Sequence, residues 1–246
     1  MFSSILANYV ANILTLLSLA CGFVSIIFSF EEHFTFACWA IILAVVFDGF
    51  DGKVARKNPV PSEFGKELDS LSDVVSFGIA PSSLGYFFIC SRFEITATVV
   101  LFIYLACSAW RLAKYNISVN GKMKNCFSGL PTTASGGVLA SFILVYKRYT
   151  QLPPKPGLYL ILVLILAYLM ISKTKFPNFD GIKKIFCSSM VYPVFAVSIS
   201  VFAIILFYFF TGVVLPEILI FMFFLQYLIF SPFLIEKFVQ NIVVVF

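Results

Sequence analysis

The residues best suited to chemistry are four aspartates that lie close together in the chain, at positions 48, 51, 69 and 73. Asp48 and Asp51 are spaced to share one helix face, and Asp69 and Asp73 are spaced to share another. If the two faces meet, four carboxylates enter one small volume, where they repel strongly unless cations neutralise them. Because no His or Cys accompanies them, their oxygens favour a hard divalent cation such as Mg2+ or Mn2+, which commonly binds phosphates.

The same aspartates have a plainer interpretation, as helix-cap and surface charges in a loop between membrane spans. The rest of the pattern disfavours it, because Gly52, the pair Ala55 and Arg56, and Gly65 stand at fixed distances from the carboxylates. The whole pattern resembles the signature of the CDP-alcohol phosphotransferase family, which consists of DxxDGxxAR, eight further residues and then GxxxDxxxD. Every fixed position of this signature is filled. Three later stretches, SFGIAP, RLAKYN and FSGLP, resemble the phosphatidylserine synthase branch of that family.

The resemblance implies an enzyme that transfers the phosphatidyl group from CDP-diacylglycerol to L-serine and releases CMP. It covers residues 12–141, and Lys114 stands where that branch often has a second arginine. It implies that two divalent ions, Mg2+ or Mn2+, are bound by Asp48, Asp51, Asp69 and Asp73. It also implies that Asp73 is the general base that accepts the proton of the acceptor hydroxyl.

Substrate-binding roles are expected for five further residues. Arg56 has the planar fork that suits a pyrophosphate oxygen, and Gly52, Ala55 and Gly65 leave room for CDP-diacylglycerol. For the glycines, helix packing is an equally good interpretation. Arg111 is the candidate for the serine carboxylate. A membrane-interface anchor remains the alternative for both arginines.

Composition predicts an all-α integral membrane protein. The chain is 61% hydrophobic and 12% charged, with a mean hydropathy of +1.00, whereas soluble domains average about 25% charged residues. Apolar runs predict about eight transmembrane helices. We expect one transmembrane domain over 1–246, with a six-helix catalytic core in 1–175 and additional helices in 176–246. The expected spans are 8–30, 34–52, 72–91, 95–113, 130–148, 157–172, 190–210 and 214–235.

The basic residues predict the orientation. Eight spans put 13 of the 17 Lys and Arg residues on one side, which the positive-inside rule assigns to the cytoplasm. The aspartates fall on that same side, so the site is expected at the cytoplasmic interface of the cell (inner) membrane. Basic residues scattered among loops suit anionic lipid better than nucleic acid. The family resemblance further implies a homodimer.

Other functions fit parts of the pattern. Acids within a membrane also occur in cation transporters, although there they lie at the midplane rather than at one edge, and a structural scaffold is a third reading. Within the enzyme interpretation, glycerol 3-phosphate, inositol phosphate or a choline-type alcohol are rival acceptors. His33 is the single histidine and falls on the opposite membrane face, which favours direct displacement over a covalent histidine intermediate.

Asn12, Thr15 and Ser18 recur at helical spacing in the first span, either as contacts between helices or as a polar stripe facing the aspartates.

Overall fold

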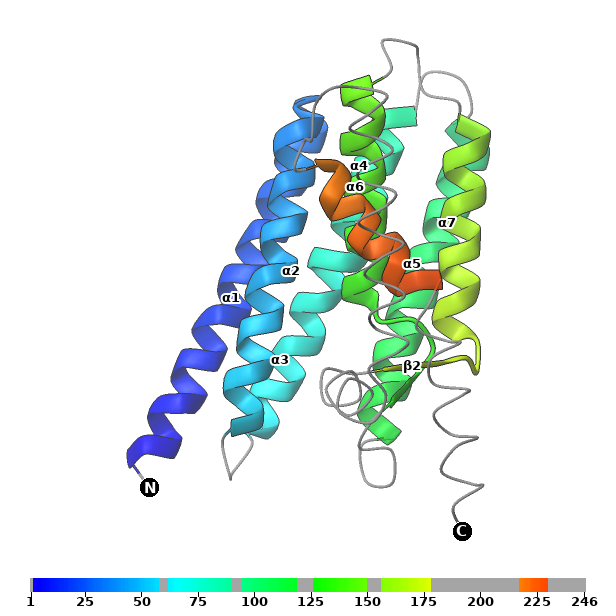
Figure 1. Cartoon of the computed structure of the whole chain (residues 1–246). Helices are drawn as coiled ribbons and strands as arrows, with labels where there is room; N and C mark the ends of the chain where they lie inside the picture. Colours follow the sequence, from blue (N-terminus) through cyan, green and yellow to red (C-terminus); the bar gives the residue numbers. More distant parts are fainter. Residues whose placement is uncertain are drawn as a thin grey trace.

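The computed structural model describes residues 2–57, 62–89, 94–118, 126–149, 156–177 and 217–229. Within these ranges the chain is a bundle of helices (Figure 1). The labelled elements are α1 (Phe2–Phe30), α2 (Phe34–Lys57), α3 (Glu63–Asp73), η1 (Val74–Ile79), α4 (Ala80–Ile89), α5 (Glu94–Ser118), β1 (Cys126–Ser128), α6 (Thr132–Tyr149), α7 (Pro156–Ile171) and β2 (Lys175–Pro177). A further helix occupies 217–229, which we call the C-terminal helix.

The expectation of a helical membrane protein is confirmed. Among the described residues, three helices are long and apolar enough to cross a bilayer, at Ala7–Phe30, Phe34–Ala55 and Ile95–Ile117. Gly157–Ile171 and Glu217–Ile229 are shorter apolar helices. Helices also occupy residues 72–89 of the expected span at 72–91 and residues 132–148 of the expected span at 130–148, while the expected span at 190–210 lies outside the described residues. The predicted total of eight spans therefore stays a prediction.

Helices α1 and α2 form a close antiparallel pair, which runs side by side in Figure 1. The chain reverses between them at Glu32, whose φ of 59° lies in the left-handed region. Two buried serines of α1 donate hydrogen bonds to carbonyl oxygens of α2, from Ser25 to Ala37 at 2.9 Å and from Ser18 to Ala44 at 3.2 Å. Ser18 thus has the interhelical role that its spacing predicted.

Helix α3, η1 and α4 follow one another without a break and make one long helical rod. Ser62 caps its start by accepting a hydrogen bond from the Gly65 amide at 3.2 Å. The middle segment, η1, is π-helical, and the Ala80 amide bonds the Val75 carbonyl five residues back. The helix begins nine residues before the span expected from residue 72, because the polar first turns of α3 lack an apolar signal.

The rod packs against α1 through hydroxyl groups and a close glycine contact at Gly22. Ser72 donates to the Thr15 carbonyl at 3.1 Å and Ser76 to the Ser18 carbonyl at 2.9 Å. A Cβ atom on Gly22 of α1 would lie 2.7 Å from the Ser76 Cα, so only glycine permits this approach. These contacts fix the height and rotation of α3 against α1.

A short antiparallel pairing, which the sequence analysis did not predict, joins the segments before α6 and after α7. Strand β1 pairs with β2 in a register that sets Phe127 opposite Phe176. Gly129 then turns the chain with a φ of +84°, and its amide donates to the Thr174 carbonyl at 2.8 Å. This turn delivers the chain to the N-terminus of α6.

The C-terminal helix packs across α6, and Figure 1 shows it in orange to red over the other helices. Phe224 is buried against Gly137, where a Cβ atom would overlap its ring. Phe221 lies edge-on to Phe142 with their ring centroids 6.1 Å apart. The bundle interior beneath it includes Tyr104, which is fully buried and donates to the Phe77 carbonyl at 2.9 Å.

Candidate active site

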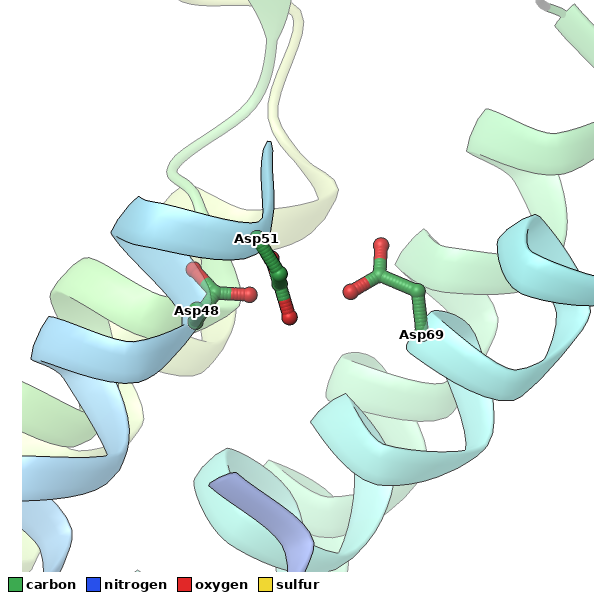
Figure 2. A group of neighbouring side chains, drawn as sticks. All are labelled: Asp48, Asp51 and Asp69. Atoms are coloured by element: carbon green, nitrogen blue, oxygen red, sulfur yellow. The ribbon is translucent and has the colours of Figure 1, made fainter. Parts of the chain in front are cut away.

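Three of the four aspartates converge between α2 and α3. Each of Asp48, Asp51 and Asp69 offers a carboxylate oxygen, and these three oxygens lie within 4.8 Å of one another. Figure 2 shows the two α2 side chains pointing across a gap toward Asp69 on α3. The helical spacing therefore predicted this arrangement correctly: residues i and i+3 of α2 share a face, and that face meets α3.

Asp73 lies beside this group, one helical turn beyond Asp69, at the last residue of α3. Its side chain is 8% exposed. It interacts electrostatically with Asp48 and Asp69, and it is close enough to Asp48 to form a side-chain hydrogen bond. The three-carboxylate group does not include it among the described residues. The structure thus brings Asp73 to the edge of the cluster, next to Asp48.

The cluster suits a hard cation. Burial, reinforced by the negative charge of Asp48, raises the pKa of the Asp69 carboxyl to about 7, so the protein itself does not compensate all of the negative charge. The donors are carboxylate oxygens from two helices, and no imidazole or thiolate joins them in the described part of the chain. Oxygen donors of this kind match Mg2+ or Mn2+ better than zinc or copper.

Hydroxyl groups from other helices hold three of the four aspartates. Thr15 of α1 donates to Asp51 Oδ2 at 2.8 Å, and Thr133 of α6 donates to Asp48 Oδ2 at 3.3 Å. Thr132, also on α6, donates a longer bond to Asp73 Oδ2 at 3.5 Å.

These threonines differ in how far the sequence could reveal them. Thr15 belongs to the polar stripe of the first span, and it does face an aspartate, as one of the two interpretations of that stripe proposed. Thr132 and Thr133 were missed. The available signal was a pair of hydroxyl residues directly after FSGLP, where a helix was expected to begin.

Arg111 lies on the Asp73 side of the site. It projects from α5, is 9% exposed, and donates from Nη1 to Thr132 Oγ1 at 3.1 Å. It also attracts Asp73 electrostatically. A buried guanidinium held by the threonine that bonds Asp73 does not behave as a solvated interface anchor, so the alternative interpretation of Arg111 is disfavoured.

The remaining predicted substrate residues lie at the ends of the helices that carry the aspartates. Gly52 is half-buried and Ala55 is exposed on α2, one turn apart. The Arg56 side chain lies outside the described residues. A Cβ atom on Gly65 would lie 2.9 Å from Asn12 Oδ1 of α1. This close approach supports the packing interpretation of Gly65 and leaves its ligand role untested.

Comparison with known proteins gives a consistent result. The family model described as CDP-alcohol phosphatidyltransferase matches residues 8–174. A CDP-diacylglycerol–serine O-phosphatidyltransferase of Helicobacter pylori is 35% identical over 173 residues, which cover 70% of this chain and 73% of the relative. An archaetidylserine synthase of Methanothermobacter thermautotrophicus is 36% identical over 172 residues, covering 69% and 70%. A Bacillus subtilis protein with the same name as the H. pylori relative is 33% identical over 172 residues, covering 70% and 92%.

Proposed function

This chain belongs to the CDP-alcohol phosphatidyltransferase family, and we propose that it transfers the phosphatidyl group of CDP-diacylglycerol to L-serine, giving phosphatidylserine and CMP. The observation that carries the proposal is the convergence of Asp48, Asp51 and Asp69 beside Asp73 and the buried Arg111. Carboxylates that can bind cations and a guanidinium that can bind a carboxylate therefore lie at one place. The names of the relatives in three organisms support serine as the acceptor.

The family is generally dependent on divalent metal ions, and the aspartate cluster is compatible with that use. We assign Asp48, Asp51, Asp69 and Asp73 as the residues that hold two ions, Mg2+ or Mn2+. When bound, such ions neutralise the pyrophosphate and stabilise the leaving CMP. Thr15 and Thr133 orient two of these carboxylates, as outer-shell hydrogen bonds do at metal sites generally.

The proton of the serine hydroxyl goes to Asp73 in this proposal. The serine oxygen forms a bond to the phosphorus that carries diacylglycerol, the bond from that phosphorus to CMP breaks, and the Asp73 carboxylate receives the proton. Thr132 supports this carboxylate and contacts Arg111 as well. One hydroxyl therefore links the base to the residue that we assign to the serine carboxylate. No covalent enzyme intermediate is required.

In this proposal, residues at the helix ends bind the donor CDP-diacylglycerol. We assign Arg56 to a pyrophosphate oxygen, and Gly52, Ala55 and Gly65 to the wall of the CDP-diacylglycerol site. Donor acyl chains have to stay in the bilayer while cytidine reaches water, so these residues belong at a membrane surface. The distribution of basic residues supports the cytoplasmic face of the inner membrane.

The proposed architecture has eight transmembrane helices. Residues 1–175 would form the catalytic core, in agreement with the family match to 8–174, and 176–246 would add the last helices. The proposed functional unit is a homodimer. Crosslinking of the protein in native membranes, followed by electrophoresis, tests the dimer.

The first experiment compares acceptors. Purified full-length protein in detergent receives CDP-diacylglycerol and Mn2+ or Mg2+, with serine, glycerol 3-phosphate, inositol phosphate, choline or no acceptor, and both CMP and the lipid product are measured. Serine-dependent release that a chelator abolishes is the expected result. Release with another acceptor would keep the family and refute serine. Failure with every acceptor, by folded protein, would refute the enzyme and direct attention to cation transport.

The matched control for this experiment is Asp69→Asn, which removes one charge of the cluster and changes no shape. Any CMP release that persists in this variant at the wild-type rate comes from a contaminant or from a site elsewhere. The Asp69→Asn protein should unfold at the same temperature as wild type, so that a loss of activity can be attributed to the missing charge rather than to misfolding.

A further inference from the structure

The stretch SFGIAP at residues 76–81 ends in a proline that the proposed function does not use. Proline has no amide hydrogen, so Pro81 cannot donate the α-helical bond to the carbonyl four positions back, which belongs to Phe77. The π-helical segment η1 stands directly before this proline, and π turns are one of the ways in which a helix accommodates such an interruption. Phe77 is fully buried, where a carbonyl without its usual donor is costly unless another group supplies the hydrogen.

The hydroxyl of Tyr104 on α5 supplies a hydrogen to this carbonyl, at 2.9 Å. The same hydroxyl oxygen lies 2.9 Å from Ser135 Oγ in the first turn of α6. Ser135 in turn donates to the Thr132 carbonyl at 2.7 Å. Tyr104, Ser135 and Thr132 are all fully buried. Two hydroxyl hydrogens thus serve three contacts, and together these contacts join the π-helical segment to the start of α6.

The backbones of α6 and η1 also come close at this point. A Cβ atom on Gly136, the residue after Ser135, would lie 3.4 Å from the Phe77 Cα and 3.3 Å from its Cβ. Both distances are shorter than the usual separation of two carbon atoms in contact. The hydroxyl link therefore lies where the two helical segments touch, and it acts on their relative height rather than on a distant loop.

This height decides how Asp73 meets Thr132. Asp73 precedes Phe77 by four residues in the rod, and Thr132 precedes Ser135 by three residues in α6. Holding Phe77 beside Ser135 therefore also holds Asp73 beside Thr132, about one turn earlier on both segments. The bond from Thr132 Oγ1 to Asp73 Oδ2 is already long, at 3.5 Å, so a small relative shift of the two segments would break it.

We propose that Tyr104 and Ser135 are positioning residues for the general base, because they set the height at which the Thr132 hydroxyl meets Asp73. The inference rests on the proposed function, in which Asp73 receives the proton of the acceptor. Both hydroxyls act through Thr132 and not on a substrate. A base that is held in place transfers the proton faster than one that is displaced, since proton transfer depends strongly on geometry.

The test begins with Tyr104→Phe in the full-length protein, which keeps the ring and removes only the hydroxyl. We expect kcat to fall about fivefold, as for loss of one ordinary hydrogen bond, while the KM values for serine and CDP-diacylglycerol stay within about twofold of wild type. Binding of labelled CDP-diacylglycerol should be unchanged. Ser135→Ala breaks the same link from the α6 side and should have the same effects.

The matched control is Tyr159→Phe, the same substitution at another buried tyrosine. Tyr159 is 1% exposed, and its hydroxyl has no hydrogen-bond partner in the described part of the chain. Its removal should leave kcat unchanged and should not lower the unfolding temperature.

A double-mutant cycle with Thr132→Val separates positioning from general structural support. If Tyr104 acts through the Thr132 hydroxyl, Tyr104→Phe should change kcat by less than about twofold once that hydroxyl is gone. Two independent structural effects would instead multiply. The cycle uses folded protein, checked by its unfolding temperature, and if Tyr104→Phe does not fold then Ser135→Ala takes its place.

Two results overturn this inference alone: a wild-type kcat in both Tyr104→Phe and Ser135→Ala beside an impaired Thr132→Val, or effects that multiply in the cycle. A wild-type kcat in Thr132→Val would refute the support of Asp73 by Thr132, and this inference with it. Use of a different acceptor by the wild-type protein would refute serine, and the same kcat comparisons would then be made with that acceptor.

Discussion

Replacing Thr15 by valine removes the hydroxyl that supports Asp51 while keeping the branched shape of the side chain. The bond from Thr15 Oγ1 to Asp51 Oδ2 is 2.8 Å long, and both residues are 4% exposed. Water cannot readily take the place of a donor at such depth. The carboxylate would therefore lose one hydrogen bond and one constraint on its orientation.

The magnitude follows from the type of bond. A hydrogen bond to a charged group contributes about 1.5–3 kcal/mol, and 1.4 kcal/mol corresponds to a factor of about ten in affinity. The single Thr15 hydrogen also lies within reach of the Ala11 carbonyl, at 3.0 Å, which places the effect at the lower end. We expect half-maximal activity of Thr15→Val to require about tenfold more Mn2+ or Mg2+, in line with outer-shell substitutions at metal sites.

The assay titrates the metal at saturating CDP-diacylglycerol and serine and follows CMP release. Thr15→Ser, which retains the hydroxyl, should recover most of the metal affinity. Ser29→Ala is the matched control, because Ser29 is a buried hydroxyl of α1 that donates to the Ser25 carbonyl, near the other end of the helix. The reasoning is refuted if Thr15→Val has the metal dependence of wild type, or if Thr15→Ser is equally impaired.

Three further predictions concern the base, the acceptor site and the packing of α1. Asp73→Asn should lower CMP release by at least about a hundredfold, the usual contribution of a general base, while binding of labelled CDP-diacylglycerol stays measurable; substantial activity would contradict the base assignment. Arg111→Lys replaces a fork by a point charge and should raise the KM for serine about tenfold with little change for CDP-diacylglycerol, and equal changes in both would indicate a structural role. Gly22→Ala places a methyl group 2.7 Å from the Ser76 Cα and should lower stability by about 1–3 kcal/mol, seen as a lower unfolding temperature. Gly49→Ala, which meets nothing within 4 Å, should not lower it, and a similar loss in both variants would show that the close contact is not the cause.

The convergence of the aspartates could be predicted because it depends on local periodicity. Asp48 and Asp51 needed only a helix to share a face, and α2 provides it. Composition was sufficient for the membrane helices, since apolar runs of that length have few other stable environments. The burial of Arg111 was harder to foresee, because a basic residue at a helix end has the same sequence pattern whether it faces lipid headgroups or an aspartate.

Contacts between distant segments left no comparable signal. Thr132 and Thr133 bond Asp73 and Asp48, which lie 59 and 85 positions away in the chain. The pair of hydroxyl residues after FSGLP does not by itself identify these partners. The docking of the C-terminal helix on Gly137 through Phe224 is a similar case, because it is a property of packed surfaces rather than of periodicity.

The π-helical turn at Val74–Ile79 allows the two halves of the rod made of α3, η1 and α4 to direct their side chains independently around the helix axis. Each residue of an α-helix advances the side chains by about 100°, so in an unbroken α-helix the direction of Asp73 would dictate the direction of every residue down to Ile89. One wider turn between the two halves removes that link. The carboxylate half can face Asp48 while the half that contains Leu84 faces the bundle interior. Deleting one residue from this turn would restore a continuous α-helical periodicity through the rod. One half would then have to rotate away from the residues that it contacts.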